Sequence, residues 1–138
     1  MEMWDLVKLY SRSIKSEHYI EAMSIGYQML EQVFEFMLLK TTAGNDGNPL
    51  SKTKVNKAGY LLSKAKLAKE HDFITQDILD DVIAFNNIRK DAVHNMISKG
   101  IDYEKVQECA EMVAPIYHKV QSQFLTFEPG EWKPITLD

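Results

Sequence analysis

An arginine and a histidine lie five positions apart in the stretch FNNIRKDAVHNM, and together they could cleave a phosphodiester bond. Histidine has an ordinary pKa of about 6.5, so it can accept and donate protons near neutral pH. Arginine stays charged and can hold a phosphate through two parallel hydrogen bonds. Because a base, an acid and a cation suffice for attack of a ribose 2′-hydroxyl on its phosphate, Arg89 and His94 predict metal-independent RNA cleavage.

The spacing of Arg89 and His94 argues against a site built by one straight helix. Five residues of α-helix rotate by about 500°, which leaves the two side chains about 140° apart and separated by about 7.5 Å of rise. The motif also offers only one titrating group, whereas acid and base catalysis needs two. We therefore expect a helix end or kink at the motif, or a twofold dimer in which a second copy completes the site.

Other motifs add little chemistry. Arg12 and His18 fit the same loose spacing, but they straddle an expected helix junction at residues 15–16. The histidines show no HxxxH or HExxH spacing and Cys109 is the single cysteine, so no metal site is predicted. Asp77 and Asp81 could hold a cation, although carboxylates in a first helical turn usually serve the helix itself. Phosphate-loop, dinucleotide and hydrolase motifs are absent, and no cofactor is expected.

Lysines gather in the segment 51–69, which holds six of them and no acid. The segment carries +6 and the rest of the chain −10, within a net charge of −4. One interpretation is a solvated lysine face, and the other is an RNA-contacting patch. On the second interpretation, RNA would be bound by Lys52, Lys54 and Lys57, with Lys90 and Asn95 beside the Arg89 and His94 pair.

The elements that must position these residues are helices. Apolar residues recur at steps of three and four, and no stretch alternates as a strand would. The fold class expected is all-α, a four-helix up-down bundle with a short extra N-terminal helix. The helices are predicted over 1–15, 17–40, 60–71, 76–99 and 103–124, with the 17–40 helix central, a loop over 41–56, caps at Thr75 and Asp102, and a kink at Pro115.

Length and composition complete the expectations. The 138 residues suit one domain, placed at 1–125 and followed by an extended tail at 126–138. A single cysteine fits a reducing compartment, and the acidic N-terminus resembles no secretion signal, so a cytoplasmic protein without a membrane segment is expected.

The stretch GYLLSKAKLAKEHDFITQDILDDVIAFNNIRKDAVHN, within an all-helical domain, resembles the HEPN superfamily. The likeness extends from about Tyr19 to Phe124 and rests on the family's arginine, four to six residues, histidine motif. It implies a HEPN-like fold, a homodimer with both motifs at the interface, and cleavage of an RNA substrate to a 2′,3′-cyclic phosphate and a 5′-hydroxyl. Arg89 would bind the scissile phosphate and His94 would transfer protons. A minimal nucleotidyltransferase would be the antitoxin partner of a toxin of this kind.

Two other functions are also compatible with the sequence. The family commonly has a small polar residue after the arginine, where this chain has Lys90. That departure is compatible with a non-catalytic HEPN-like module that dimerises and binds RNA, nucleotide or protein. The regular apolar stripe of the last helix is also compatible with a purely structural helical adaptor.

Overall fold

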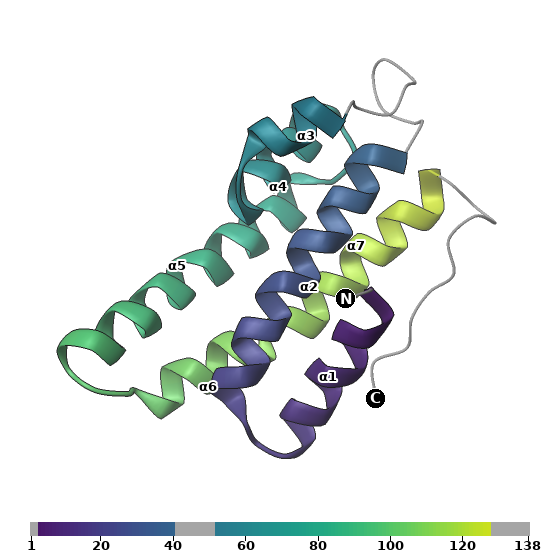
Figure 1. Ribbon diagram of the computed structural model, residues 1–138. Helices are drawn as coiled ribbons and strands as arrows, with labels where there is room; N and C mark the ends of the chain where they lie inside the picture. The colour runs from purple at the N-terminus through teal and green to yellow at the C-terminus, as the bar shows by residue number, and fades with distance from the viewer. Residues whose placement is uncertain (1–2, 41–51, 128–138) are drawn as a thin grey trace.

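The computed structural model describes residues 3–40 and 52–127, and this part of the chain is all-α without strands (Figure 1). None of the described helices is long and apolar enough to cross a lipid bilayer. The helices are α1 (Met3–Lys15), α2 (Tyr19–Lys40), α3 (Lys52–Ala58), α4 (Leu61–Glu70), α5 (Gln76–Ser98), α6 (Tyr103–Glu111) and α7 (Val113–Phe127).

Helix α2 is the centre of the core, as its wide apolar face predicted. It packs against α1, α3, α4, α6 and α7, and Figure 1 shows it running through the middle of the molecule. Met29, Leu30, Val33 and Phe34 on this helix are fully buried. Helix α5 packs on α4, α6 and α7 and so forms an outer layer.

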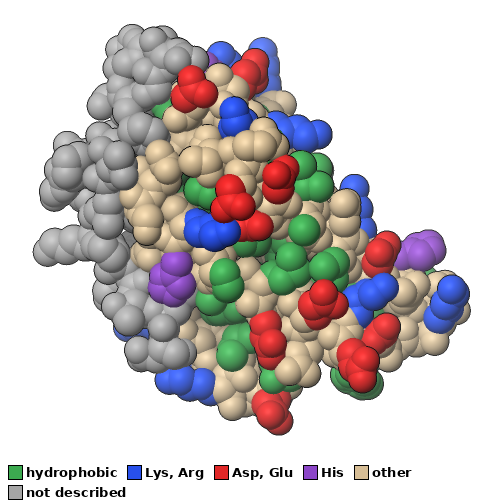
Figure 2. Space-filling model, turned by 180° about the vertical axis from the view of Figure 1, so that it is seen from behind, with side chains coloured by type: hydrophobic (Ala, Val, Ile, Leu, Met, Phe, Trp, Pro, Cys, Tyr) green, Lys and Arg blue, Asp and Glu red, His purple; other side chains and the backbone are tan. Residues whose placement is uncertain are grey.

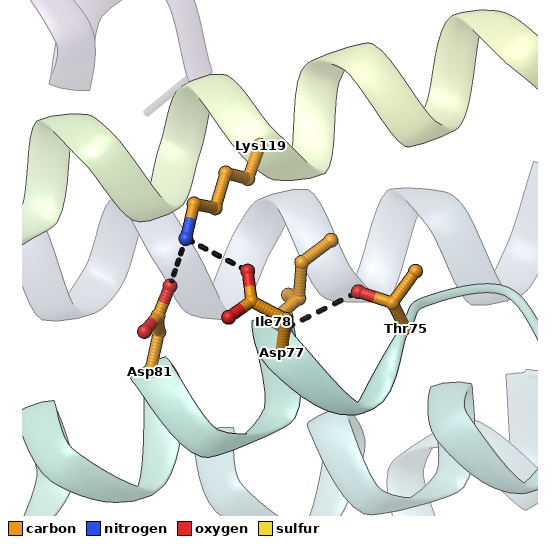
Figure 3. A network of polar contacts seen from close by, with 5 residues as sticks. All are labelled: Thr75, Asp77, Ile78, Asp81 and Lys119. Atoms are coloured by element: carbon orange, nitrogen blue, oxygen red, sulfur yellow. Dashed lines mark hydrogen bonds and ion pairs between the residues drawn. The ribbon is translucent and has the colours of Figure 1, made fainter.

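The start of α5 is fixed by two sets of polar contacts (Figure 3). The hydroxyl oxygen of Thr75 accepts a hydrogen bond from the Ile78 N–H at 3.3 Å, which confirms the predicted cap. The ammonium of Lys119 on α7 donates to Asp77 at 2.9 Å and to Asp81 at 2.7 Å. These hydrogen bonds raise the pKa of Lys119 above its ordinary value. The two carboxylates considered for a cation therefore join α5 to α7.

The predicted loop over 41–56 is wrong in its last part, because α3 begins at Lys52. The helix KTKVNKA contains neither glycine nor proline, and its Val55 is only 1% exposed against the core. Burial of that apolar side chain stabilises a turn that local sequence alone would leave marginal. Residues 41–51 lie outside the described part.

The last helix is divided into two helices rather than bent in one. Asp102 caps α6 as predicted, accepting from the Lys105 N–H at 3.1 Å, but α6 ends at Glu111 and α7 starts at Val113. Pro115 explains the break, because its ring would clash with the carbonyl of Glu111 in a continuous helix. Helix α7 ends at Phe127, two residues inside the expected tail, whose remainder lies outside the described residues.

Gly26 gives α2 its close contact with the start of α7. A Cβ atom at this position would lie 2.5 Å from Val113 Cγ2, well inside van der Waals contact. Gly26→Ala should therefore destabilise the fold by about 1–3 kcal/mol despite the better helix propensity of alanine. Urea denaturation would measure the loss, and Val113→Ala in the same chain should restore part of it. A Gly26→Ala variant at least as stable as the unsubstituted protein would contradict this packing.

Candidate functional site

Arg89 is held in place by an aromatic ring. It lies on α5, half-buried, with its guanidinium carbon 4.1 Å from the centre of the Tyr27 ring on α2. The Tyr27 hydroxyl accepts a weak hydrogen bond, 3.4 Å long, from the Leu61 N–H at the start of α4. The Arg89 Nε atom is buried, and no hydrogen-bond partner for it is found in the described part of the chain. Stacking therefore fixes the guanidinium plane and leaves polar capacity unused.

An open hollow of about 490 Å³ lies beside this arginine, between α2, α4 and α5. Helix α2 contributes Tyr27, and α5 contributes Asn86, Arg89 and Lys90, while the beginning of α4 forms the third side. A volume of this size falls within the range of about 300–1,000 Å³ that is usual for ligand pockets. Arg89 and Lys90 make the α5 side cationic, so the hollow suits an anion.

His94 does not share this hollow. Helix α5 continues without interruption to Ser98, four residues past the histidine, so no helix end brings His94 toward Arg89. The His94 side chain is exposed, and Ser98 Oγ donates to its backbone carbonyl at 3.1 Å. Its neighbours Val93 and Ile97 are exposed apolar residues, Ile97 to 85%. Within one chain the side chains of Arg89 and His94 therefore lie apart, as helix geometry predicts.

The exposed end of α5 is a projection from the body of the molecule. In Figure 1 this end extends beyond α6, and from behind it forms the protrusion at the right of Figure 2. Acidic, basic and histidine side chains lie together on that protrusion. Because a projecting surface is open to another molecule, a second copy could reach His94 without displacing the core.

Three of the other residues predicted to contact RNA do not line the hollow. Lys54 and Lys57 are exposed on α3, and Asn95 is half-buried on α5, but none of the three lines it. Lys52 begins α3, and its side chain lies outside the described part. Among the residues predicted to bind RNA, Lys90 is therefore the one that lines the hollow together with Arg89. RNA contacts of Lys52, Lys54, Lys57 and Asn95 stay predictions.

One lysine of the basic segment is not solvated. Lys64 on α4 is only 5% exposed, and its ammonium donates to Glu35 at 2.7 Å and lies 4.0 Å from Glu31. The interpretation of all six lysines as one solvated or RNA-contacting face is therefore wrong for Lys64. This ion pair fastens α4 to α2 next to the hollow.

The thiol of Cys109 lies buried on α6, where it contacts the Phe85 carbonyl on α5 at 3.9 Å. Burial raises its pKa from 9.0 to about 12, and the charge of Arg89 offsets part of that rise. The thiol is therefore protonated at neutral pH and poorly nucleophilic.

Alkylation tests this burial. At pH 8 iodoacetamide should modify Cys109 at least about 100-fold more slowly in the native protein than in urea. Fold stability should also fall as pH rises from 9 to 12, because the thiol ionises in the unfolded chain before it does in the native one. Equal alkylation rates in the two states would contradict the buried position.

Comparison with known proteins adds no assignment: the chain matches no protein-family model, no curated protein and no solved structure. Within residues 3–40 and 52–127, no group of three or more His, Cys, Asp or Glu side chains is placed to hold a metal ion.

Sequence reasoning missed the aromatic and amide components of the hollow. Tyr27 belonged to the apolar stripe of α2, and Tyr60 and Asn86 were not selected as site residues. Tyr60 is the first residue of the helix predicted over 60–71, and only the structure places it before α4 as the N-cap. The pairing of Tyr27 with Arg89 depends on the register of two helices, which no local pattern specifies.

Proposed function

We propose that the protein is a dimeric, metal-independent endoribonuclease of the HEPN type, acting as a toxin or in defence in the cytoplasm. The observation that carries this proposal is the arrangement of the motif along an unbroken α5. Arg89 lies at a cationic hollow with an unpartnered Nε, and His94 stands exposed five residues further along. Each group is suited to its task in cleavage, but they must meet across an interface.

The exposed apolar residues around His94 support a twofold interface at this place. Val93 and Ile97 flank the histidine and are 37% and 85% exposed. Exposed apolar residues next to a functional group are frequent where proteins associate. An isologous contact through this part of α5 would place His94 of each copy near the Arg89 of the other.

The chemistry then needs only groups of the two chains. One His94 would remove the proton of the ribose 2′-hydroxyl, and the 2′-oxygen would form a new bond to phosphorus. The bond from phosphorus to the 5′-oxygen would break, and the second His94 would protonate that leaving oxygen. Arg89 would stabilise the negative charge that develops on the phosphate. The products would be a 2′,3′-cyclic phosphate and a 5′-hydroxyl.

We further propose that the fold is a HEPN-like up-down bundle. Its four main helices would be α2, α4, α5 and the α6 and α7 pair, with α1 as the extra N-terminal helix. The packing of α2 against α1, α4, α6 and α7 supports this arrangement. A minimal nucleotidyltransferase antitoxin is the partner that such a toxin would require.

The test is cleavage of structured and single-stranded RNAs by the purified full chain in excess EDTA. We expect 5′-hydroxyl ends and 2′,3′-cyclic phosphate ends, detected by end-specific ligation and mass spectrometry. Intact RNA, or products with 5′-phosphate ends, would contradict the proposed reaction.

A second candidate is a non-catalytic module that dimerises and binds RNA or nucleotide. The observation that favours it is the hollow itself, which Arg89 and Lys90 line and His94 does not. RNA binding that is lost in Arg89→Ala and kept in His94→Ala, without cleavage by any variant, would select this function.

A further inference from the structure

Helix α4 begins at the hollow, where the Tyr27 hydroxyl accepts from the first N–H, that of Leu61, but the N-cap residue supplies no side-chain cap. Tyr60 occupies the N-cap position with an extended backbone, and its side chain makes no capping hydrogen bond. Leu62 and Ser63 in the first turn line the hollow. The N–H groups of a first turn have no carbonyl partner within their helix, and they form the positive end of its dipole. Together they suit an anion such as phosphate.

A buried polar side chain on α5 faces the same space. Asn86 is only 6% exposed, yet it lines the hollow. Among the described residues no partner for its side-chain amide is found. Its amide atoms are not among the fully buried unpartnered atoms, so they are open to the hollow, where the amide can donate hydrogen bonds to a ligand and accept them.

The charges around the hollow are of one sign. Arg89 and Lys90 are cationic, and no acid is among the described residues that line the space. Glu31 and Glu35 on α2 do not line the hollow, and the ammonium of Lys64 on α4 is paired with both. An anion in the hollow therefore meets two cations and a helix N-terminus, and Lys64 offsets one of the two negative charges of Glu31 and Glu35.

Tyr60 supplies the aromatic part of the site. Its side chain is 78% exposed at the edge of the hollow, so its ring has a free face. Stacking of a nucleobase on an exposed aromatic ring is the usual way in which proteins hold single-stranded nucleic acid. The exposed tyrosine thus suits the base of a nucleotide, and the neighbouring anion site suits its phosphate.

We propose that this hollow binds one nucleotide, with its phosphate on the α4 N-terminus, Arg89 and Lys90, and its base stacked on Tyr60. The inference rests on the proposed function, because Arg89 serves both and the nucleotide would be part of the RNA substrate. The nucleotide could belong to an RNA chain or be a free mononucleotide, and the experiment separates these sources.

The experiment is calorimetric titration of the full-length protein with 2′-O-methyl hexaadenylate, which cannot be cleaved by 2′-hydroxyl attack. Tyr60→Ala should weaken binding by about 5- to 100-fold, as expected for loss of one stacked base. Tyr60→Phe keeps the ring and should bind like the unsubstituted protein. Tyr103→Ala is the matched control, since Tyr103 is a similarly exposed tyrosine, at 69%, that does not line this hollow.

Two further ligands test the phosphate. Adenosine, which lacks phosphate, should bind at least about tenfold more weakly than AMP if the cations and the helix N-terminus hold the phosphate. AMP binding as tight as that of the hexanucleotide would assign the site to free nucleotides, and much weaker AMP binding would assign it to RNA. Adenosine binding equal to AMP binding would overturn the phosphate assignment.

The outcomes separate this inference from the proposed function. Hexanucleotide binding that is unchanged in Tyr60→Ala, or equally reduced in Tyr103→Ala, would overturn the base site even if RNA cleavage is observed. Conversely, binding that depends on Tyr60 and on the phosphate, in a protein that cleaves no RNA, would support the nucleotide site and reject the nuclease.

Discussion

His94→Ala is expected to lower the rate of RNA cleavage by about 100- to 10,000-fold, the usual contribution of a general acid or base. The fold should be unaffected, because the histidine side chain is exposed and Ser98 donates only to its backbone carbonyl, which alanine retains. RNA binding should also persist, since His94 does not line the hollow. A fluorescent RNA substrate gives the rate, and thermal unfolding gives the stability.

His118→Ala is the matched control for this substitution. His118 is likewise exposed, on α7, and lies outside the motif. The His118→Ala variant should cleave RNA at the rate of the unsubstituted protein. Cleavage by His94→Ala within about twofold of that rate would reject His94 as the proton-transfer group.

Arg89→Ala should lower the cleavage rate by about 100- to 1,000-fold, because the main cation that stabilises the charge developing on the phosphate is lost. RNA binding should weaken too, in contrast to His94→Ala. Thermal stability should decrease, since the stack of Arg89 on Tyr27, 4.1 Å from guanidinium carbon to ring centre, is lost. Cleavage and binding measured on the same preparation, checked by circular dichroism, separate these effects.

Arg89→Lys distinguishes charge from geometry at the same position. Lysine keeps the charge but cannot form two parallel hydrogen bonds to phosphate or stack as a planar group. We expect binding close to that of the unsubstituted protein and cleavage still reduced. Full cleavage by Arg89→Lys would show that a point charge suffices, and full cleavage by Arg89→Ala would exclude Arg89 from the site.

The fold could be predicted from the sequence where the information is local. Thr75 and Asp102 were correctly placed as caps, because a short polar side chain before an apolar stripe has few other tasks. The central position of α2 followed from its wide apolar face. The break at Met112 was missed because the apolar stripe continues across it, and periodicity alone does not show how proline acts on the preceding turn.

The candidate site was predictable only in part. Arg89 was found because its spacing from His94 is a sequence property, and Lys90 because it is adjacent. The contacts with Tyr27 and the first turn of α4 are set by helix packing between segments far apart in the chain. The pairing of Lys64 with Glu35 was missed for the same reason, since a lysine in a basic run gives no sign of burial.

The central claim is that Arg89 and His94 act together across two chains, and a mixture of the unsubstituted protein with an Arg89→Ala/His94→Ala double variant tests it most directly. After equal amounts have exchanged subunits, about a quarter of the dimers are fully unsubstituted and about half carry one intact motif. The proposed reaction needs the His94 of both copies, so only the fully unsubstituted dimers should cleave RNA. The rate should therefore fall to about a quarter of that of the same total amount of unsubstituted protein. A rate of about one half, with exchange verified by native mass spectrometry, would show that one chain suffices and would contradict the claim.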